Sequence, residues 1–283
     1  MRVWGLWVFM TSSFAANAQS YTGDSWEQTR TNGQGTITIA YAETPAFVTK
    51  DASGKLTGIC VDIMKDFVDY VSKTKNVKLE MKTVGAGANC KIMFDVVKTS
   101  QGGVFGLGNI TITEGRKKEA KFGPPYISNF AIFITHNKTP MLASLEDLPV
   151  MFRGFTAYTE RGTLNDKRIL ELKNKYLPGI RITYSESTQE TLERISADPS
   201  GFAYIDLMFY LQAVKERKSV KRHPVGDKAA EQFGFAMPLN SDWGPMLEEF
   251  FNAKGGYINS TQYKRILARI WERWVLDSCK GNQ

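Results

Sequence analysis

The chain has 283 residues, of which 42% are hydrophobic and 23% charged, and its formal net charge is +7. This composition is typical of a globular protein, and the length suffices for two compact domains with separate hydrophobic cores. The positive charges are spread along the chain without a long basic block, so no nucleic-acid partner is expected. Two histidines and no Cys-x-x-Cys pair leave few ligands for a transition metal, and we expect neither a metal nor a cofactor.

Residues 1–18 have the pattern of a secretory signal peptide. Arg2 is followed by an apolar run over residues 3–10 and by a small-x-small sequence that ends at Ala18. The run is far shorter than the ~20 residues that a membrane-spanning helix needs, and no later stretch is apolar enough to span a bilayer. We therefore expect cleavage after Ala18 and a mature chain that begins at Gln19, is soluble and is exported.

Export makes disulfide bonds between the cysteines possible. Three are present, Cys60, Cys90 and Cys279, so one stays unpaired within the chain. A Cys60–Cys90 bridge is one hypothesis, since both residues precede or open helices that follow neighbouring strands. Three buried or terminal thiols are the alternative, and the sequence leaves the two open.

The first half of the mature sequence alternates between strand-like and helix-like patterns. Residues 19–33 are polar and predict an irregular lead-in, whereas residues 36–41 alternate as a half-buried strand does. We also expect strands at 77–84 and 104–108, a helix that starts at Cys60 and another helix at 91–99. This strand–helix–strand–helix–strand order predicts a parallel sheet covered by helices. Ligands of such sheets bind beyond the carboxyl ends of the strands, where the loops 43–47 and 109–116 lie.

A second α/β unit follows a nearly continuous apolar strand over residues 129–135. Its pattern predicts strands at 155–158, 180–184 and 201–205, and helices at 162–176, 188–197 and 207–218. A short strand at 233–237 comes next. The C-terminal part is expected to form two helices, at 242–252 and 260–275, the second with one apolar face.

The stretch from Asn109 to Tyr126 contains the first candidate binding site. Thr113 can N-cap a short helix, which must end before Pro124. Thr111 and Arg116 flank the start of this helix, so a hydroxyl, free backbone N–H groups and a guanidinium can converge on one carboxylate. A capped surface helix with a solvated Arg-Lys-Lys run is the alternative, and on spacing alone it is the commoner case.

Two further features lie at a strand end or a helix start. Gly162 and Thr163 precede free backbone amides, and Asp206 ends the strand at 201–205. Together with Arg116 they suit a zwitterion, with Arg116 binding its carboxylate and Asp206 its ammonium group. Thr163 and Asp206 can equally cap the helices that follow them.

Four segments carry a resemblance to a known family. The most specific is Thr-Ile-Thr-Glu-Gly-Arg at 111–116, followed by Phe122 and by Pro-Tyr at 125–126. The others are Pro-Ala-Phe at 45–47 with Gly-Lys-Leu-Thr-Gly at 54–58 and Val-Asp-Ile at 61–63, Arg-Gly-Thr at 161–163, and Ala-Tyr-Ile-Asp at 203–206. With these motifs the chain, over residues 36–275, resembles the polar amino-acid-binding family of periplasmic solute-binding proteins, which share their fold with glutamate-receptor ligand-binding domains.

The resemblance implies an α/β architecture, the type II periplasmic binding protein fold, in which two crossing strands form a hinge between two lobes. Lobe 1 would be discontinuous, with residues 34–130 and 236–283, and lobe 2 would comprise residues 131–235. The crossing strands would lie near residues 130–135 and 233–237.

The resemblance also implies a ligand site. Arg116 and Thr111 would hold the α-carboxylate of an amino acid with help from Thr163. Asp206 and the carbonyl group of Asn109 would hold the α-ammonium group.

Two residues of the opening loop are further candidates. Glu43 could pair with a basic ligand side chain or remain a solvated carboxylate, and Phe47 could pack against the ligand or fill the lobe. The family usually has an aromatic residue where Thr44 stands and an acidic residue where Cys60 stands. These positions shape the pocket, so the ligand's side chain is left open.

The function implied is capture of a polar amino acid, or a close derivative, and its delivery to the membrane permease of an ABC-type importer. Such a protein would be a monomer and not an enzyme. The alternative class is a dehydratase of the cyclohexadienyl or arogenate kind on the same fold, for which Glu43 and Glu160 are the candidate proton donors. A ligand-sensing domain for a membrane partner would need no different site.

Overall fold

The computed structural model describes residues 20–280, except for the side chains of residues 229–230 and 271–280. The expected signal peptide and its cleavage site therefore lie outside the described residues. Among the described helices, none combines the length and the apolar character that a membrane crossing requires.

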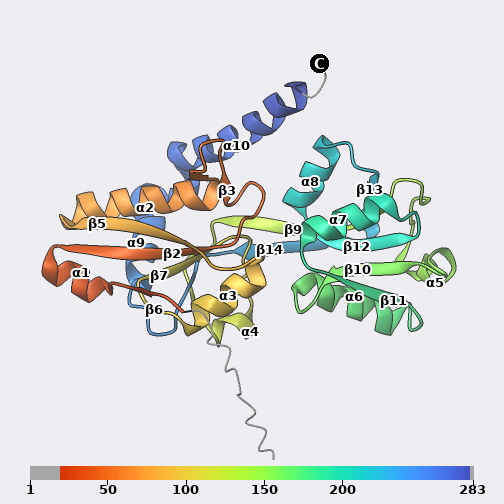
Figure 1. Cartoon of the computed structure of the whole chain (residues 1–283), viewed down its shortest axis with the longest axis horizontal. Coiled ribbons are helices and arrows are strands. Elements are labelled where there is room, and N and C mark those ends of the chain that lie inside the picture. The colour runs from red at the N-terminus through yellow and green to blue at the C-terminus, as the bar shows by residue number, and fades with distance from the viewer. Residues whose placement is uncertain (1–19, 281–283) are drawn as a thin grey trace, which may run out of the picture.

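Two β-sheets form the centres of two lobes that lie side by side (Figure 1). The sheet of lobe 1 has the strand order β5-β2-β7-β15-β8, and that of lobe 2 has the order β11-β10-β12-β9-β13, with β14 also paired to β9. The strands of lobe 1 are β2 (Gln34–Tyr41), β5 (Lys78–Gly85), β7 (Val104–Leu107), β8 (Lys121–Phe122) and β15 (Ala236–Met237). The strands of lobe 2 are β9 (Ile127–His136), β10 (Thr156–Glu160), β11 (Arg181–Ser185), β12 (Gly201–Asp206), β13 (Val220–Arg222) and β14 (Lys228–Phe233).

Helices cover both faces of each sheet (Figure 1). Lobe 1 carries α1 (Trp26–Asn32), α2 (Ile59–Lys75), α3 (Cys90–Thr99), α4 (Glu114–Lys117), α9 (Gly244–Asn252) and α10 (Thr261–Lys280). Lobe 2 carries α5 (Leu148–Met151), α6 (Leu164–Lys175), α7 (Thr188–Ala197) and α8 (Leu207–Lys215). Small strand pairs join β1 (Thr22–Gly23) to β6 (Gln101–Gly102) and β3 (Thr49–Lys50) to β4 (Leu56–Thr57).

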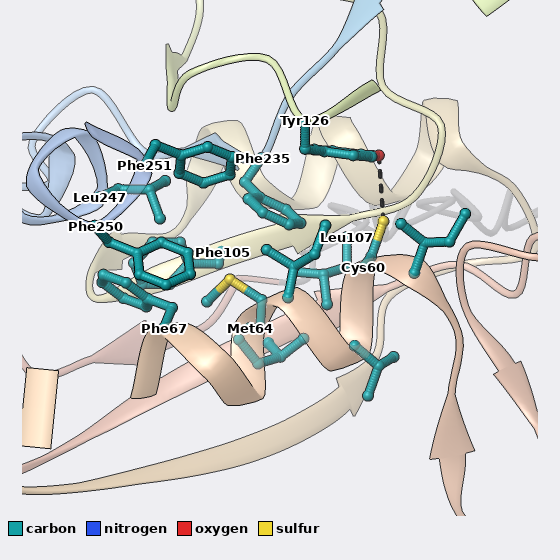
Figure 2. Packing of buried hydrophobic residues seen from close by; sticks show 14 of the residues in the cluster. Cys60, Met64, Phe67, Phe105, Leu107, Tyr126, Phe235, Leu247, Phe250 and Phe251 are labelled. Carbon is teal, nitrogen blue, oxygen red and sulfur yellow. Dashed lines mark hydrogen bonds between the residues drawn. The ribbon is translucent and has the colours of Figure 1, made fainter. Parts of the chain in front are cut away.

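The core of lobe 1 is dominated by aromatic side chains from elements far apart in sequence (Figure 2). Phe67 of α2 packs against Phe105 of β7 at 5.9 Å and against Phe250 of α9 at 5.6 Å, measured between ring centroids. Each fully buried side chain of this size contributes roughly 1.5–3 kcal/mol of transfer free energy. The apolar period of α2 is thus explained, because its buried stripe joins the sheet to α9.

The two lobes are connected by crossing strands, as the fold class requires. Strand β14 runs antiparallel to β9 with Phe233 opposite Ile127 and Lys228 opposite Ala131. The single strand expected at 233–237 is wrong: β14 ends at Phe233, and β15 begins at Ala236 in the other sheet. Between them, a Cβ on Gly234 would approach Ile112 Cδ1 to 2.8 Å, so only glycine fits this bend without a shift.

The prediction that residues 19–33 form an irregular lead-in is also wrong, because this segment contains β1 and α1. Ser25 and Gln28 form a capping box at the start of α1, in which each side chain accepts from the other residue's backbone N–H. The ring of Trp26 lies 5.3 Å from that of Trp243, whose indole N–H donates to the carbonyl of Asp24 at 2.8 Å. The segment is therefore part of lobe 1. The lobe boundaries at residues 130 and 235 remain predictions.

The hypothetical Cys60–Cys90 bridge is wrong, because both thiols are free. Cys60 is fully buried with Sγ 3.2 Å from Tyr126 Oη (Figure 2), and Cys90 donates to Asn109 Oδ1 at 2.8 Å. Burial raises the pKa of Cys60 to about 12 and that of Cys90 to about 11. Each thiol thus has a polar partner of its own, and the side chain of Cys279 lies outside the described residues.

Candidate functional site

A cavity of about 320 Å³ lies between the lobes and is lined by residues from both. This volume is within the range of small-molecule sites, roughly 300–1,000 Å³. The lining residues of lobe 1 are Glu43, Thr44, Pro45, Ala88, Asn89, Cys90, Lys91, Asn109, Thr111 and Arg116. Those of lobe 2 and the crossing strands include Glu160, Thr163, Leu164, Asn165, Arg168, Ser187, Thr188, Gln189, Thr191, Tyr204, Asp206, Phe209 and Glu231. We refer to this cavity as the cleft.

The cleft lies at the carboxyl ends of the parallel strands. In lobe 1, β2 pairs in parallel with β5 and β7, and the segments that follow β2 and β7 supply Glu43 and Asn109. In lobe 2, β10 ends at Glu160 and its parallel neighbour β12 ends at Asp206. Ligands of open α/β sheets bind at this edge, which explains why loops distant in sequence meet here.

Arg116 is one of two cationic residues, with Lys91, that lobe 1 contributes to the cleft lining. Thr113 caps α4 as expected, by accepting from the backbone N–H of Arg116 at 3.2 Å. The guanidinium donates to the carbonyl of Thr111 at 3.0 Å and lies 5.3 Å from the ring centroid of Phe94. Burial lowers the pKa of Arg116, and no carboxylate within residues 20–280 forms an ion pair with it. Four of the five guanidinium N–H groups are therefore left for other acceptors.

Asp206 faces Arg116's lobe from the end of β12 and is held by two amides. Asn109 Nδ2 donates to its Oδ2, and Asn129 Nδ2 donates to its Oδ1 at 3.1 Å. Asp206 stands at the N-terminus of α8 but makes no side-chain cap bond there, contrary to the simple capping alternative. Burial raises its pKa, against the opposing effects of the Asn109, Asn129 and Asn165 amides and of the charge of Arg168.

The two threonine candidates, Thr111 and Thr163, differ in their surroundings. Thr111 is buried beside the crossing strand, where its backbone forms a bridge with Phe233, and it lines the cleft. Thr163 also lines the cleft, but its hydroxyl donates to the carbonyl of Glu160 at 2.8 Å and accepts from the N–H of Asp166 at 3.1 Å. The hydroxyl of Thr163 thus caps α6.

The two candidates of the opening loop, Glu43 and Phe47, lie in different surroundings. Glu43 lines the cleft mouth, but it forms an ion pair with Lys50 at 2.5 Å and its side chain is 53% exposed. Phe47 is 1% exposed and packs against Phe233 at 5.6 Å in the lobe 1 core, away from the cleft lining. Phe47 thus fills the lobe core, whereas Glu43 pairs with Lys50, which neither alternative for it anticipated.

An ion pair that the sequence analysis missed lies in the lining of the cleft. Arg168 of α6 pairs with Glu231 of the crossing strand β14, and their side chains are only 11% and 13% exposed. Arg168 also donates to Asn165 Oδ1 at 2.6 Å. The partners are far apart in sequence and neither lies in a motif, so no local signal indicated the pair.

Two side-chain hydrogen bonds connect the lobes across the cleft. Asn109 of lobe 1 reaches Asp206 of lobe 2, and Asn89 Nδ2 of lobe 1 donates to the carbonyl of Glu186 in lobe 2 at 3.3 Å. Within residues 20–280, no group of three His, Cys, Asp or Glu side chains is arranged to hold a metal ion.

This geometry, two α/β lobes joined by crossing strands around a charged cleft, defines the type II binding-protein class. Consistent with it, residues 37–274 match the family model of bacterial extracellular solute-binding proteins, family 3, and the chain belongs to that family. The resemblance inferred from the motifs is therefore confirmed.

Solved structures of similar fold support the class. An ancestral arginine-binding protein bound to arginine shares 21% identity, with a TM-score of 0.62 and coverage of 84% of this chain and 97% of that chain. The Drosophila muscle GluRIIB complex with glutamate shares 15% identity at a TM-score of 0.66, covering 84% and 98%. An ancestral amino acid-binding protein described as a precursor of cyclohexadienyl dehydratase shares 20% identity at a TM-score of 0.62, covering 88% and 98%. At these identities the likeness concerns the fold alone.

One curated relative is an enzyme. A membrane-bound lytic murein transglycosylase F of Pseudomonas fluorescens is 26% identical over 160 residues, which are 56% of this chain. The match spans only 30% of that relative's length.

Proposed function

We propose that the protein is an extracytoplasmic binding protein that captures a polar amino acid, or a close derivative, in the cleft. The observation that supports this most is the pair of opposite charges facing each other across it: Arg116 from lobe 1 and Asp206 from lobe 2. An α-amino acid carries a carboxylate and an ammonium group on one carbon, which matches such a pair.

The pKa shifts have the directions expected of a site that pairs its charges with those of a zwitterion. Burial lowers the pKa of Arg116 and raises that of Asp206, so each group is costly to keep charged without an added partner of opposite charge. A ligand carboxylate beside Arg116 and a ligand ammonium beside Asp206 remove both costs at once. Thr111 is proposed to assist the carboxylate, and Thr163 to contribute through the backbone amides at the start of α6.

In the proposed function, ligand binding is accompanied by closure of the two lobes. A ligand that contacts both lobes favours the closed form by its differential affinity for that form. The crossing strands β9 and β14 are the proposed hinge. Delivery to the permease of an ABC-type importer, a periplasmic location and a monomeric state complete the proposal.

A dehydratase is the second candidate, and one observation favours it. Glu160 lines the cleft, and burial together with the charge of Asp206 raises its pKa to about 7. A carboxyl group that is half protonated near neutral pH could donate a proton to a leaving hydroxyl. We favour binding, because the opposed charges of Arg116 and Asp206 match a zwitterionic ligand, whereas Glu160 alone supports the dehydratase.

Calorimetry against the common amino acids tests the proposal. Arg116→Ala should weaken binding at least about thirtyfold, because leaving a buried ligand charge without its protein partner costs roughly 2–5 kcal/mol. Arg153→Ala is the matched control, since Arg153 is exposed and outside the cleft lining. Equal affinity in the two variants would reject the site. Formation of phenylalanine or phenylpyruvate from arogenate-like substrates would instead establish the dehydratase.

A further inference from the structure

The charges that line the cleft do not balance. Three cationic side chains and four acidic ones line it in the described residues. Several of these already have partners: Arg168 pairs with Glu231, Lys91 with Asp95 at 3.0 Å, and Glu43 with Lys50 at 2.5 Å.

Three lining charges remain without an ion-pair partner in residues 20–280. They are the cation Arg116 and the two carboxylates Asp206 and Glu160. Asp206 is hydrogen-bonded by two amides, whereas the Glu160 carboxylate has no hydrogen bond to any described residue. The cleft therefore presents one positive and two negative positions to a ligand.

The two carboxylates stand at the ends of neighbouring strands. Strands β10 and β12 are parallel and adjacent, with Ala157 opposite Phe202, and they end at Glu160 and Asp206. Adjacent strands lie about 4.8 Å apart, so both carboxylates reach the same edge of the lobe 2 sheet. A ligand with two separate cationic groups can engage one with each.

We propose that the ligand is an amino acid with a cationic side chain, and that Glu160 binds this side chain. The inference rests on the proposed function, since it assigns the α-carboxylate to Arg116 and the α-ammonium group to Asp206. A basic amino acid has one negative and two positive groups, which complements the one positive and two negative positions of the cleft.

The electrostatics of Glu160 agree with this assignment. Its pKa is raised to about 7 by burial first and by Asp206 second, while Lys91 acts in the opposite direction. Lys91 belongs to α3 and lies near Gly162, but its ammonium group is engaged by Asp95. The ligand's cation would supply the partner that the described residues do not.

Matched ligands test the proposal without any substitution. Arginine and citrulline have nearly the same shape but differ in side-chain charge, and lysine and norleucine form a second such pair. We expect arginine or lysine to bind at least about tenfold more tightly than its neutral counterpart, because a hydrogen bond to a charged group contributes roughly 1.5–3 kcal/mol.

Variants then assign the difference to Glu160. Glu160→Gln should lower the arginine-to-citrulline affinity ratio at least about fivefold, whereas Glu248→Gln should leave it unchanged. Glu248 is the matched control, because it is exposed, lies outside the cleft lining and is not among the charges that act on Glu160. Thermal unfolding of each variant without ligand confirms that it is folded.

The possible outcomes distinguish failure of this inference from failure of the proposed function on which it rests. Binding of neutral or acidic amino acids alone, with dependence on Arg116, would overturn the basic-ligand proposal and leave the amino-acid site intact. An arginine preference that Glu160→Gln does not change would overturn the role of Glu160. Binding of no amino acid at all would overturn both proposals.

Discussion

Asn109 of lobe 1 donates its side-chain amide to the carboxylate of Asp206 in lobe 2. The other end of the same amide is fixed, because Oδ1 of Asn109 accepts from the thiol of Cys90 at 2.8 Å. The role of the Asn109 backbone carbonyl toward a ligand stays a prediction, and the structure adds that its side chain bridges the lobes. The bond therefore contributes to closure as well as to the orientation of Asp206.

Removal of this bridge should open the ligand-free protein. Asn109→Ala removes a hydrogen bond to a charged group, typically about 1.5–3 kcal/mol, and so weakens the attraction between the lobes. Small-angle X-ray scattering should show a larger radius of gyration than in the wild type. Asn137→Ala, at an exposed position outside the cleft, should leave the curve unchanged. Identical scattering from all three proteins would show that Asn109 does not favour closure.

Much of the fold followed from periodicity and from turn and cap residues. The helix expected at 188–197 is α7 (Thr188–Ala197), and Thr113 caps α4 as its position indicated. The lead-in was predicted wrongly because its polarity outweighed the Ser25–Gln28 capping box, which is a readable helix signal. The break after Phe233 was missed because the apolar run favours one strand, although Gly234 within it is a readable sign of a bend.

The site was less predictable than the fold. Arg116 and Asp206 were indicated by motifs, and both line the cleft. The pairing of Arg168 with Glu231 depends on how α6 meets the crossing strand, which no local pattern encodes. Phe47 was a ligand-binding candidate but packs in the core. The sequence alone does not distinguish an aromatic residue that contacts a ligand from one that fills a core.

The Arg168–Glu231 pair gives a second prediction. Glu231→Ala leaves a guanidinium nearly buried without its partner and should lower the free energy of unfolding by about 3–5 kcal/mol. The double variant Arg168→Met with Glu231→Leu should recover most of this stability, because it removes both desolvation costs. Urea unfolding measures each value.

An exposed pair supplies the control. Glu27 and Arg30 form an ion pair with side chains 66% and 59% exposed, so Glu27→Ala should cost less than about 1 kcal/mol. A Glu231→Ala cost as small as that of Glu27→Ala would contradict the buried character of the pair in solution.

The cysteines give a third prediction. Because burial raises the pKa of Cys60 to about 12 and of Cys90 to about 11, very little thiolate forms at mildly alkaline pH. Iodoacetamide should therefore leave both residues unmodified in the native protein and alkylate both in denaturant without a reductant. Peptide mass spectrometry resolves the individual sites. A Cys60–Cys90 disulfide peptide from unreduced protein would refute the free thiols.

His223 links the stability of lobe 2 to pH. Its Nδ1 accepts from the N–H of Leu142 at 3.0 Å, so the proton of the neutral ring lies on Nε2, 2.7 Å from Thr135 Oγ1. The hydroxyl of Thr135 in turn donates to the carbonyl of His136 at 2.9 Å. Protonation of Nδ1 would break this chain at Leu142.

Burial lowers the pKa of His223 to about 4 from its usual 6.5. The unfolded chain therefore binds more protons between these values, and the stabilisation is complete above the unfolded pKa and is lost as pH falls toward the folded one. The decrease in stability should approach about 3 kcal/mol, at 1.36 kcal/mol per pKa unit. Urea midpoints across this range should fall less steeply in His223→Gln. Parallel curves for the two proteins would argue against a neutral buried ring.

Ligand binding should depend on pH through Glu160. The group titrates near 7 in the ligand-free cleft because burial, Asp206 on β12 and Glu186 after β11 disfavour its charged form, while Lys91 on α3 favours it. A cationic ligand binds the ionised form, so it lowers the pKa of Glu160 and binding releases a proton. Affinity for arginine should then rise by up to about tenfold between roughly pH 6 and pH 8, the range over which the ionised fraction rises from about a tenth to about nine tenths.

Calorimetry in buffers of different ionisation enthalpy counts the released proton, and Glu160→Gln should abolish both the release and the pH dependence. A pH-dependent affinity that persists in Glu160→Gln would assign the titration to another cleft carboxylate.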